Sequence, residues 1–328
     1  MIISKTPVRV SFFGGGTDYP EYFNVYGGGV LSTTIDKYIF VTVKKTNVFS
    51  DFKYRISYSK LQTCHDISEI EHPVVKAALQ FLEIPYGLEI NIISDLPART
   101  GIGSSSAFAV GLLHALHALK GRMVSKKQLA DEAIYLEQVL LQERVGVQDQ
   151  LATAYGSLNH MVFREDGLEV HPVVVSKERK ALLNDHLIMF YTGLSRYASV
   201  ILEEQVQKTQ DKKINTELKD ISDMVEEGMA ILSHPERDIN DFGRLLHKGW
   251  ETKKKLSSAI SNSFLDEIYE KAIHAGALGG KLLGAGGGGF FLFFVPPASQ
   301  GAVRAALSDL SEVEFKFENA GTRIIYMA

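Results

Sequence analysis

A glycine- and serine-rich segment, Gly101-Ile102-Gly103-Ser104-Ser105-Ser106, constrains this chain more than any other. A predicted strand over Leu88 to Ile93 precedes it, and apolar residues at helical spacing predict a helix from Ser104 to about Leu119. Small residues at a helix start leave backbone N–H groups accessible, and the helix dipole adds positive potential there. Serine N-capping is the ordinary alternative. One cap does not need three serines behind two glycines, so we favour a phosphate-binding turn.

A second glycine cluster ends a predicted strand near the start of the sequence. The strand Val8 to Phe12 leads into Gly14-Gly15-Gly16-Thr17-Asp18. Three consecutive glycines indicate a sharp turn or a close approach to a neighbour, and an ordinary flexible turn would explain this segment taken alone. Arg9 lies in the middle of the strand, where a permanent cation needs either solvent or an anionic partner.

A third glycine cluster, Gly284-Ala285-Gly286-Gly287-Gly288-Gly289, follows Lys281. Its letters satisfy the dinucleotide pattern GxGxxG, but that pattern follows a strand and opens a helix. Here the glycines precede a predicted strand, Phe290 to Val295. Leu282 also replaces the Ser/Thr that a Walker A loop requires. What remains is a backbone that lies against a ligand or a tightly packed element, and the segment alone does not choose between them.

Two carboxylates lie between the second and third glycine clusters. Glu137 belongs to a predicted helix that starts with a capping box at Ser125 and Gln128 and runs to about Val145. Glu137 shares its face with apolar residues, so it is either a buried carboxylate that needs a cation such as magnesium or an ordinary solvated glutamate. Asp149 follows a helix break and could be simply an N-cap for residues 150–155.

Composition narrows the classes of partner. The net charge of −4 provides no global basic field for nucleic acid or an anionic membrane. A single cysteine, Cys64, argues against a disulfide framework and fits a reducing compartment. The sequence lacks the pattern of a signal peptide, and its most apolar run is too short to span a bilayer. We therefore expect a cytoplasmic protein with no nucleic-acid or membrane partner.

The second half of the chain alternates predicted helices with predicted strands, and a polar run suggests a boundary within residues 172–186. The predicted helices are Val200 to Lys208, Thr216 to Leu232, Asp241 to Lys255 and Phe264 to Ala275. The predicted strands are Leu187 to Tyr191, Phe290 to Val295, Glu312 to Phe317 and Arg323 to Tyr326.

Taken in this order and at these spacings, the three glycine clusters resemble motifs one, two and three of the GHMP kinases, the family of galactokinase, homoserine kinase and mevalonate kinase. The resemblance implies an α+β fold of two domains with the active site in the cleft between them. Residues 1–175 would form a domain like the second domain of ribosomal protein S5, and residues 176–328 a ferredoxin-like α/β domain. It also implies phosphoryl transfer from ATP, with Mg²⁺, to a hydroxyl of a sugar or sugar phosphate.

The resemblance assigns a role to individual residues. Asp149 would be the base toward the acceptor hydroxyl, Arg9 would stabilise it, and Ser105 and Glu137 would hold the magnesium ion. The residues expected to line the nucleotide are Gly101, Ile102, Gly103, Ser104, Ser105, Ser106, Gly284, Ala285 and Gly286. Those expected to line the acceptor are Gly15, Gly16, Thr17, Asp18, Arg196 and Gly287.

The motif-one turn narrows the acceptor. Galactokinases carry a Glu-His pair where this chain has Gly15 and Gly16, so the turn lacks the side chains that read galactose hydroxyls. The turn, together with residues 28–38, resembles the branch of the family that phosphorylates D-glycero-D-manno-heptose 7-phosphate at O1. A fucokinase-like or galactokinase-like sugar 1-kinase, and a non-catalytic regulatory protein of the same fold, are the alternatives. Self-association into a homo-oligomer is compatible with each of them.

Overall fold

The chain folds around two β-sheets. In the computed structural model, which describes residues 1–194, 199–211 and 213–328, the larger sheet is built on two long antiparallel strands, β1 (Ile2–Phe13) and β2 (Gly28–Lys45). Its main path runs β13-β1-β2-β5-β3-β4, and β6, β7 and β12 extend it from β2. The other strands are β3 (Tyr54–Ser57), β4 (Leu61–Cys64), β5 (Leu88–Ser94), β6 (Asn159–Arg164), β7 (Gly167–Pro172), β12 (Phe317–Glu318) and β13 (Arg323–Met327).

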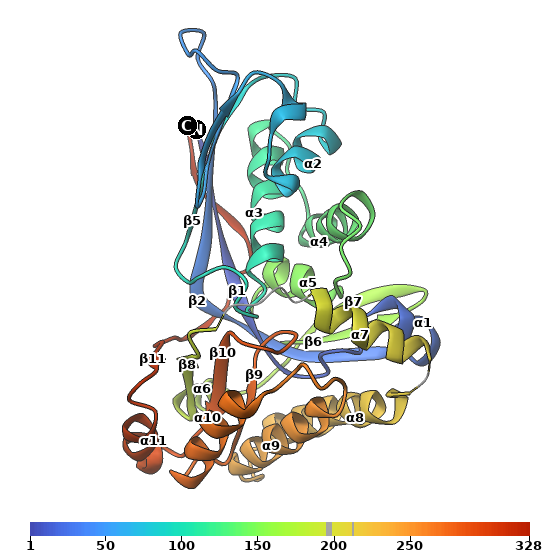
Figure 1. Cartoon of the computed structure of the whole chain (residues 1–328), viewed down its shortest axis with the longest axis vertical. Helices are drawn as coiled ribbons and strands as arrows, with labels where there is room; N and C mark the ends of the chain where they lie inside the picture. Colours follow the sequence, from blue (N-terminus) through green and yellow to red (C-terminus); the bar gives the residue numbers. More distant parts are fainter. Residues whose placement is uncertain (195–198, 212) are drawn as a thin grey trace.

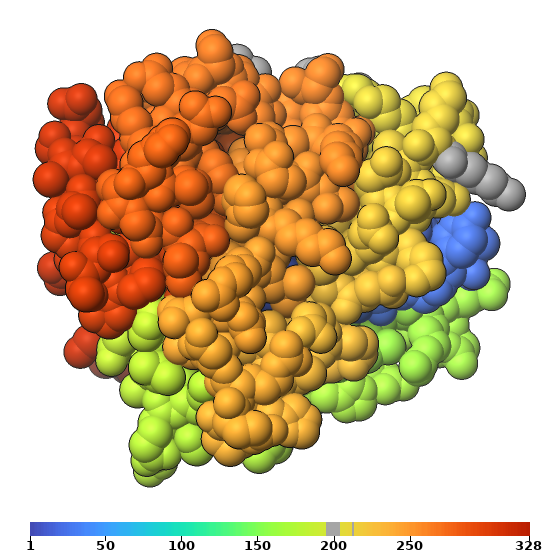
Figure 2. Space-filling model, turned by 90° about the horizontal axis from the view of Figure 1, so that it is seen from below, coloured from blue at the N-terminus to red at the C-terminus, as the bar shows by residue number. Residues whose placement is uncertain are grey.

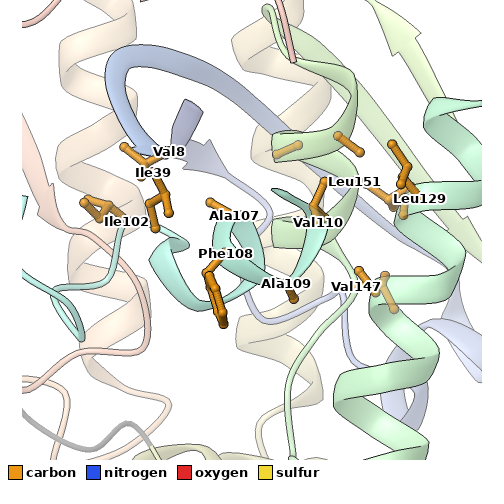
Figure 3. Packing of buried hydrophobic residues seen from close by; sticks show 14 of the residues in the cluster. Val8, Ile39, Ile102, Ala107, Phe108, Ala109, Val110, Leu129, Val147 and Leu151 are labelled. Carbon is orange, nitrogen blue, oxygen red and sulfur yellow. The ribbon is translucent and has the colours of Figure 1, made fainter. Parts of the chain in front are cut away.

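Helices cover one face of the upper part of this sheet (Figure 1). They are α2 (Pro73–Phe81), α3 (Ser104–Leu119), α4 (Lys126–Ile134) and α5 (Gln148–Tyr155). Helix α3 lies against β1 and β2 on one side and against α4 and α5 on the other, so most of its residues are buried, and most of these are apolar. Figure 3 shows Val8 and Ile39 from the sheet near Ile102 of the glycine-serine turn and Ala107 of α3, with Val110 of α3 beside Leu151 of α5. The main hydrophobic core therefore anchors the glycine-serine turn, residues 101–106, which is the phosphate-loop candidate.

The smaller sheet has the antiparallel order β11-β8-β10-β9. It comprises β8 (Leu187–Tyr191), β9 (Gly279–Leu282), β10 (Phe290–Phe294) and β11 (Ser311–Glu312). Every residue of β10 is buried, because neighbouring strands lie on both sides and other elements cover both faces, which explains its unbroken run of aromatic and leucine side chains. The predicted strands at 187–191 and 290–295 are confirmed.

The remaining helices close the lower end of the molecule. They are α1 (Pro20–Tyr26), α6 (Lys177–Asp185), α7 (Ser199–Gln210), α8 (Asn215–Ser233), α9 (Asn240–Lys254), α10 (Ser263–His274) and α11 (Gln300–Ala306). Helices α6 and α9 pack against the smaller sheet, α8 against β1 and β2, and α1 against β6. Seen from below, α8 and α9 cover much of this end, with α1 in blue at one edge (Figure 2). Gly228 of α8 lets the ring of Phe13 lie against the helix, since a Cβ there would come within 2.7 Å of that ring. The end of β1 is thus enclosed by the second half of the chain.

The prediction of one strand over residues 312–317 was wrong. The predicted strand 312–317 is split: β11 pairs with β8 of the small sheet, whereas β12 pairs with β2 of the large one. The final strand β13 also joins the large sheet, beside β1. The chain therefore crosses between the sheets a second time.

The predicted helix from 125 to 145 is shorter than expected. Helix α4 ends at Ile134, and a π-helical turn, Tyr135–Leu140, follows it. The Ser125 hydroxyl accepts a hydrogen bond from the Gln128 amide at 3.1 Å, but the Gln128 side chain donates to Glu132 instead of completing the capping box.

Among the helices of the described residues, none combines the length and apolar character that a bilayer crossing requires.

Candidate active site

A buried ion pair joins three distant segments. Arg9, 4% exposed in the middle of β1, donates from Nε and Nη2 to the two carboxylate oxygens of Asp149 at 2.7 and 2.8 Å. Its Nη1 donates to the Gly101 carbonyl at 2.6 Å. The side chain of Asp149 remains 25% exposed, on the first turn of α5. Arg9 thus has the anionic partner that its place in the strand required, and Asp149 keeps one accessible side.

The glycine-serine turn presents the start of α3 to this ion pair. Gly101 and Gly103 have φ angles of 80° and 72°, and Gly103 is the N-cap residue, without a side-chain hydrogen bond to the helix. A Cβ on Gly103 would lie 3.3 Å from Asp149 Oδ2, so the turn lies directly against the carboxylate. Serine N-capping is therefore not what the turn provides. The open helix start carries backbone N–H groups suited to an anion.

Glu137 is fully buried in the π-helical turn next to this helix start. The Ser106 hydroxyl donates to Glu137 Oε2 at 2.9 Å, and the Gln150 side-chain amide donates to the same oxygen. Burial raises the pKa of Glu137 to about 8, against the lowering effect of these two hydrogen bonds. A buried carboxylate with only neutral donors is chemically suited to a divalent cation.

The sequence interpretation paired Glu137 with Ser105, but the serine that contacts the carboxylate is Ser106. Ser105 is exposed at the helix start. The two neighbouring serines therefore face different surroundings: one faces the buried carboxylate and the other is open to a ligand.

The motif-one turn places a second carboxylate, Asp18, near Asp149. Asp18 is 1% exposed, and its Oδ1 accepts a hydrogen bond from the Gly16 amide at 3.0 Å. Burial raises the pKa of Asp18, and the nearby charge of Asp149 adds to the effect. Only glycine fits at position 146, because a Cβ there would lie 1.9 Å from Asp18 Oδ2.

Thr17, expected to line the acceptor, has its side chain engaged within the protein. It is fully buried, and its hydroxyl donates to the carbonyls of Gly14 and Gly29 at 2.8 and 3.1 Å. The side chain is used to hold the turn against β2. Arg196, the other polar acceptor candidate, lies outside the described residues.

The third glycine cluster lies against protein backbone. A Cβ on Gly284 would be 2.4 Å from Gly101 Cα, and one on Gly289 would be 2.3 Å from the Thr100 carbonyl oxygen. The Gly287 amide donates to Ile260 at 2.9 Å, so it is not free for a ligand. Of the two alternatives that the sequence left open, tight packing explains Gly284 and Gly289, and it fixes the glycine-serine turn against the segment between β9 and β10.

Three side chains near the site escaped the sequence interpretation. Lys281 of β9 donates to the Phe12 carbonyl at 2.8 Å, and Lys253 of α9 donates to the Leu282 carbonyl at 3.2 Å. Gln205 of α7 lies over the motif-one turn, where a Cβ on Gly16 would come within 2.8 Å of its Nε2. Lys253 looks like an ordinary helix-end charge in the sequence, so only the tertiary structure identifies it.

Family models match both halves of the chain. Residues 72–157 match the model described as "GHMP kinases N terminal domain", and residues 230–312 match "GHMP kinases C terminal". The first match contains the glycine-serine turn, Glu137 and Asp149, and the second contains Lys253 and the third glycine cluster.

Individual relatives agree with these matches. The chain is 29% identical to the D-glycero-alpha-D-manno-heptose 7-phosphate kinase of Campylobacter jejuni, over 98% of each sequence. It is 27% identical to the galactokinase of Pyrococcus furiosus, over 87% of this chain and 86% of that one. The solved structure of a D-glycero-D-manno-heptose 1-phosphate kinase from Bacteroides thetaiotaomicron superimposes with a TM-score of 0.82 at 24% identity, covering all of both chains. This last likeness establishes the fold.

Replacing Gly101 by Ala tests the backbone contact between the glycine-serine turn and the third glycine cluster. The new Cβ would lie 2.2 Å from the Leu283 carbonyl oxygen, at a φ of 80°. Gly121→Ala is a matched control, because Gly121 has a φ of 69° with nothing within 4 Å of a Cβ. Both variants carry a backbone cost of about 1 kcal/mol, and we expect Gly101→Ala to lose about 2 kcal/mol more through the clash. Equal free energies of unfolding in urea would contradict this contact.

Proposed function

Because this chain belongs to the GHMP kinases, a family that uses ATP as the phosphate donor, and is a phosphotransferase acting on a sugar hydroxyl, we propose that its acceptor is D-glycero-D-manno-heptose 7-phosphate, phosphorylated at O1. The Campylobacter relative that covers nearly the whole chain supports this acceptor. Gly15 and Gly16 support it too, because the turn has no side chains there to read galactose hydroxyls.

The Arg9–Asp149 pair carries the catalytic part of the proposal. Arg9 engages one face of both carboxylate oxygens, which leaves lone pairs of Asp149 open on its exposed side, beside the start of α3. We assign Asp149 as the base that accepts the proton of the acceptor hydroxyl. As that proton moves to Asp149, the acceptor oxygen bonds to the γ-phosphorus and the bond from phosphorus to the ADP oxygen breaks.

The helix start would hold the nucleotide phosphates by the backbone N–H groups of residues 103–106. Glu137 and Ser105 would hold Mg²⁺, and Ser106 would orient the Glu137 carboxylate. When bound, the ion would neutralise charge on the β- and γ-phosphates. The buried carboxylate without a cationic partner among the described residues is the observation that supports this site.

A coupled ADP-release assay against galactose, L-fucose, mannose and the heptose 7-phosphate tests the acceptor. We expect the heptose phosphate to have the highest kcat/KM. A higher value for galactose or fucose would identify a different sugar 1-kinase. Absence of ADP release with every acceptor would favour the non-catalytic alternative.

Asp149→Asn should lower kcat by about 10²- to 10⁴-fold, since the amide cannot take up the proton, while the KM for ATP stays within about twofold. Asp131→Asn is the control: Asp131 pairs with Lys127 on the surface of α4 and should behave as wild type. Near-normal turnover of Asp149→Asn would end its assignment as the base.

Alanine at each serine separates a metal ligand from a positioning residue. Ser106→Ala removes the donor of a buried carboxylate and should lower the free energy of unfolding by about 1–3 kcal/mol in the absence of nucleotide. Ser105→Ala should leave that free energy within about 0.5 kcal/mol, yet raise the Mg²⁺ concentration for half-maximal turnover by about tenfold. An unchanged Mg²⁺ requirement in Ser105→Ala would remove Ser105 from the metal site.

A further inference from the structure

A small cavity lies under the motif-one turn, on the side facing α8 and α9. Its volume is about 20 Å³, the space of roughly one water. Gly14 and Gly15 line it from the turn, apolar residues of β1, α8 and α9 form most of the rest, and Trp250, Lys253 and Lys281 are the lining residues whose side chains carry nitrogen. Two lysines in a largely apolar cavity next to the turn of the acceptor site require an explanation.

Neither lysine has a carboxylate partner within 4.0 Å among the described residues. Lys281 is 9% exposed, and Phe12 is the one acceptor that its Nζ contacts in the described part of the chain. Lys253 is partly exposed and donates to the carbonyls of Leu282 and Gly284. Each ammonium can donate three hydrogen bonds, so both retain donors for an anion.

A third donor in the cavity wall is unused. Trp250 is fully buried on α9, and within the described residues its indole Nε1 has no hydrogen-bond partner. A buried N–H without an acceptor is costly and calls for a ligand or water in the free space beside it. Three N–H-bearing side chains thus line one cavity with a surplus of donors.

The charges around the cavity also favour an anionic ligand. Burial, reinforced by the charge of Arg9, lowers the pKa of Lys253 to about 7, against the opposing effect of Asp18. Burial lowers the pKa of Lys281 well below its ordinary value, and the charges of Lys253 and Arg9 add to this. A dianionic group in the cavity would offset these repulsions and favour both ammonium forms.

We propose that Lys253, Lys281 and Trp250 form the subsite that binds the phosphate group already present on the acceptor sugar. This inference rests on the proposed function, which requires a phosphorylated acceptor. The sugar would lie along Gly14 and Gly15, with its reacting hydroxyl toward Asp149 and its phosphate toward the lysines. A phosphate is larger than the cavity, so Lys253 would exchange the carbonyls of Leu282 and Gly284 for phosphate oxygens as the group enters.

The single tryptophan of the chain is Trp250, so intrinsic fluorescence reports on this cavity directly. With the wild-type protein saturated with ADP, titration with heptose 7-phosphate should change the emission saturably. The same heptose without phosphate should need at least about tenfold higher concentration, because it lacks the charge-assisted contacts. An equal response to both sugars, or none at concentrations of the phosphate ester that saturate turnover, would overturn the subsite.

Methionine substitutions test the lysines themselves. Lys253→Met should raise the KM for heptose 7-phosphate by about tenfold or more, while kcat/KM for the unphosphorylated heptose stays within about threefold. Lys248→Met, an exposed lysine of the same helix, is the control and should change neither. Lys253→Arg keeps the charge and should recover much of the preference for the phosphorylated sugar.

The outcomes separate the two proposals. Wild-type protein that uses an unphosphorylated sugar best refutes the acceptor assignment and, with it, the subsite. Wild-type protein that prefers heptose 7-phosphate, combined with a Lys253→Met variant that weakens both acceptors equally, refutes the subsite alone. In that case the lysines serve only to tie the third glycine cluster to α9 and β1.

Discussion

The bidentate pair between Arg9 and Asp149 is the interaction on which the arrangement of this molecule depends. A guanidinium in the middle of a core strand is costly to bury, and removing one partner of such a pair typically costs about 3–5 kcal/mol. Arg9 meets that cost with three hydrogen bonds, to Asp149 and to Gly101, which belong to different parts of the chain. The strand, the phosphate-loop candidate and α5 must therefore assemble together. The same contacts that stabilise the core also fix the proposed base beside the helix start.

Glycines make the second constraint, because they let backbones meet where side chains would keep them apart. Gly14 lies against the Gly29 carbonyl, and Gly101 lies against the Leu283 carbonyl of the other sheet. Direct contact of main chains leaves little freedom for either partner to shift alone. The position of the glycine-serine turn is consequently set by the smaller sheet as much as by the larger one, although the turn belongs in sequence to the first half of the chain.

Sequence periodicity was sufficient to predict the helices and strands that bury one or both faces, such as α3, α8, β8 and β10. It failed where the partner decides the structure. Residues 312–317 look like one strand, yet their two ends pair with different sheets. Ser105 and Ser106 are adjacent and look alike in sequence, yet only Ser106 contacts Glu137. Lys253 looks like Lys254 and Lys255 in sequence, yet it donates to the Leu282 carbonyl. These distinctions arise from contacts between residues far apart in the chain, which spacing cannot encode.

The double crossing between the sheets bears on how the protein can be divided. A fragment ending near residue 175 would lack β13, which covers the outer edge of β1, and β12, which pairs with β2. Such a fragment would expose unpaired N–H and C=O groups along its longest strands, and exposed strand edges promote aggregation. The two halves are thus interleaved rather than modular. Biosensors, split reporters or domain exchanges made from this scaffold should carry the last twelve residues together with the first half.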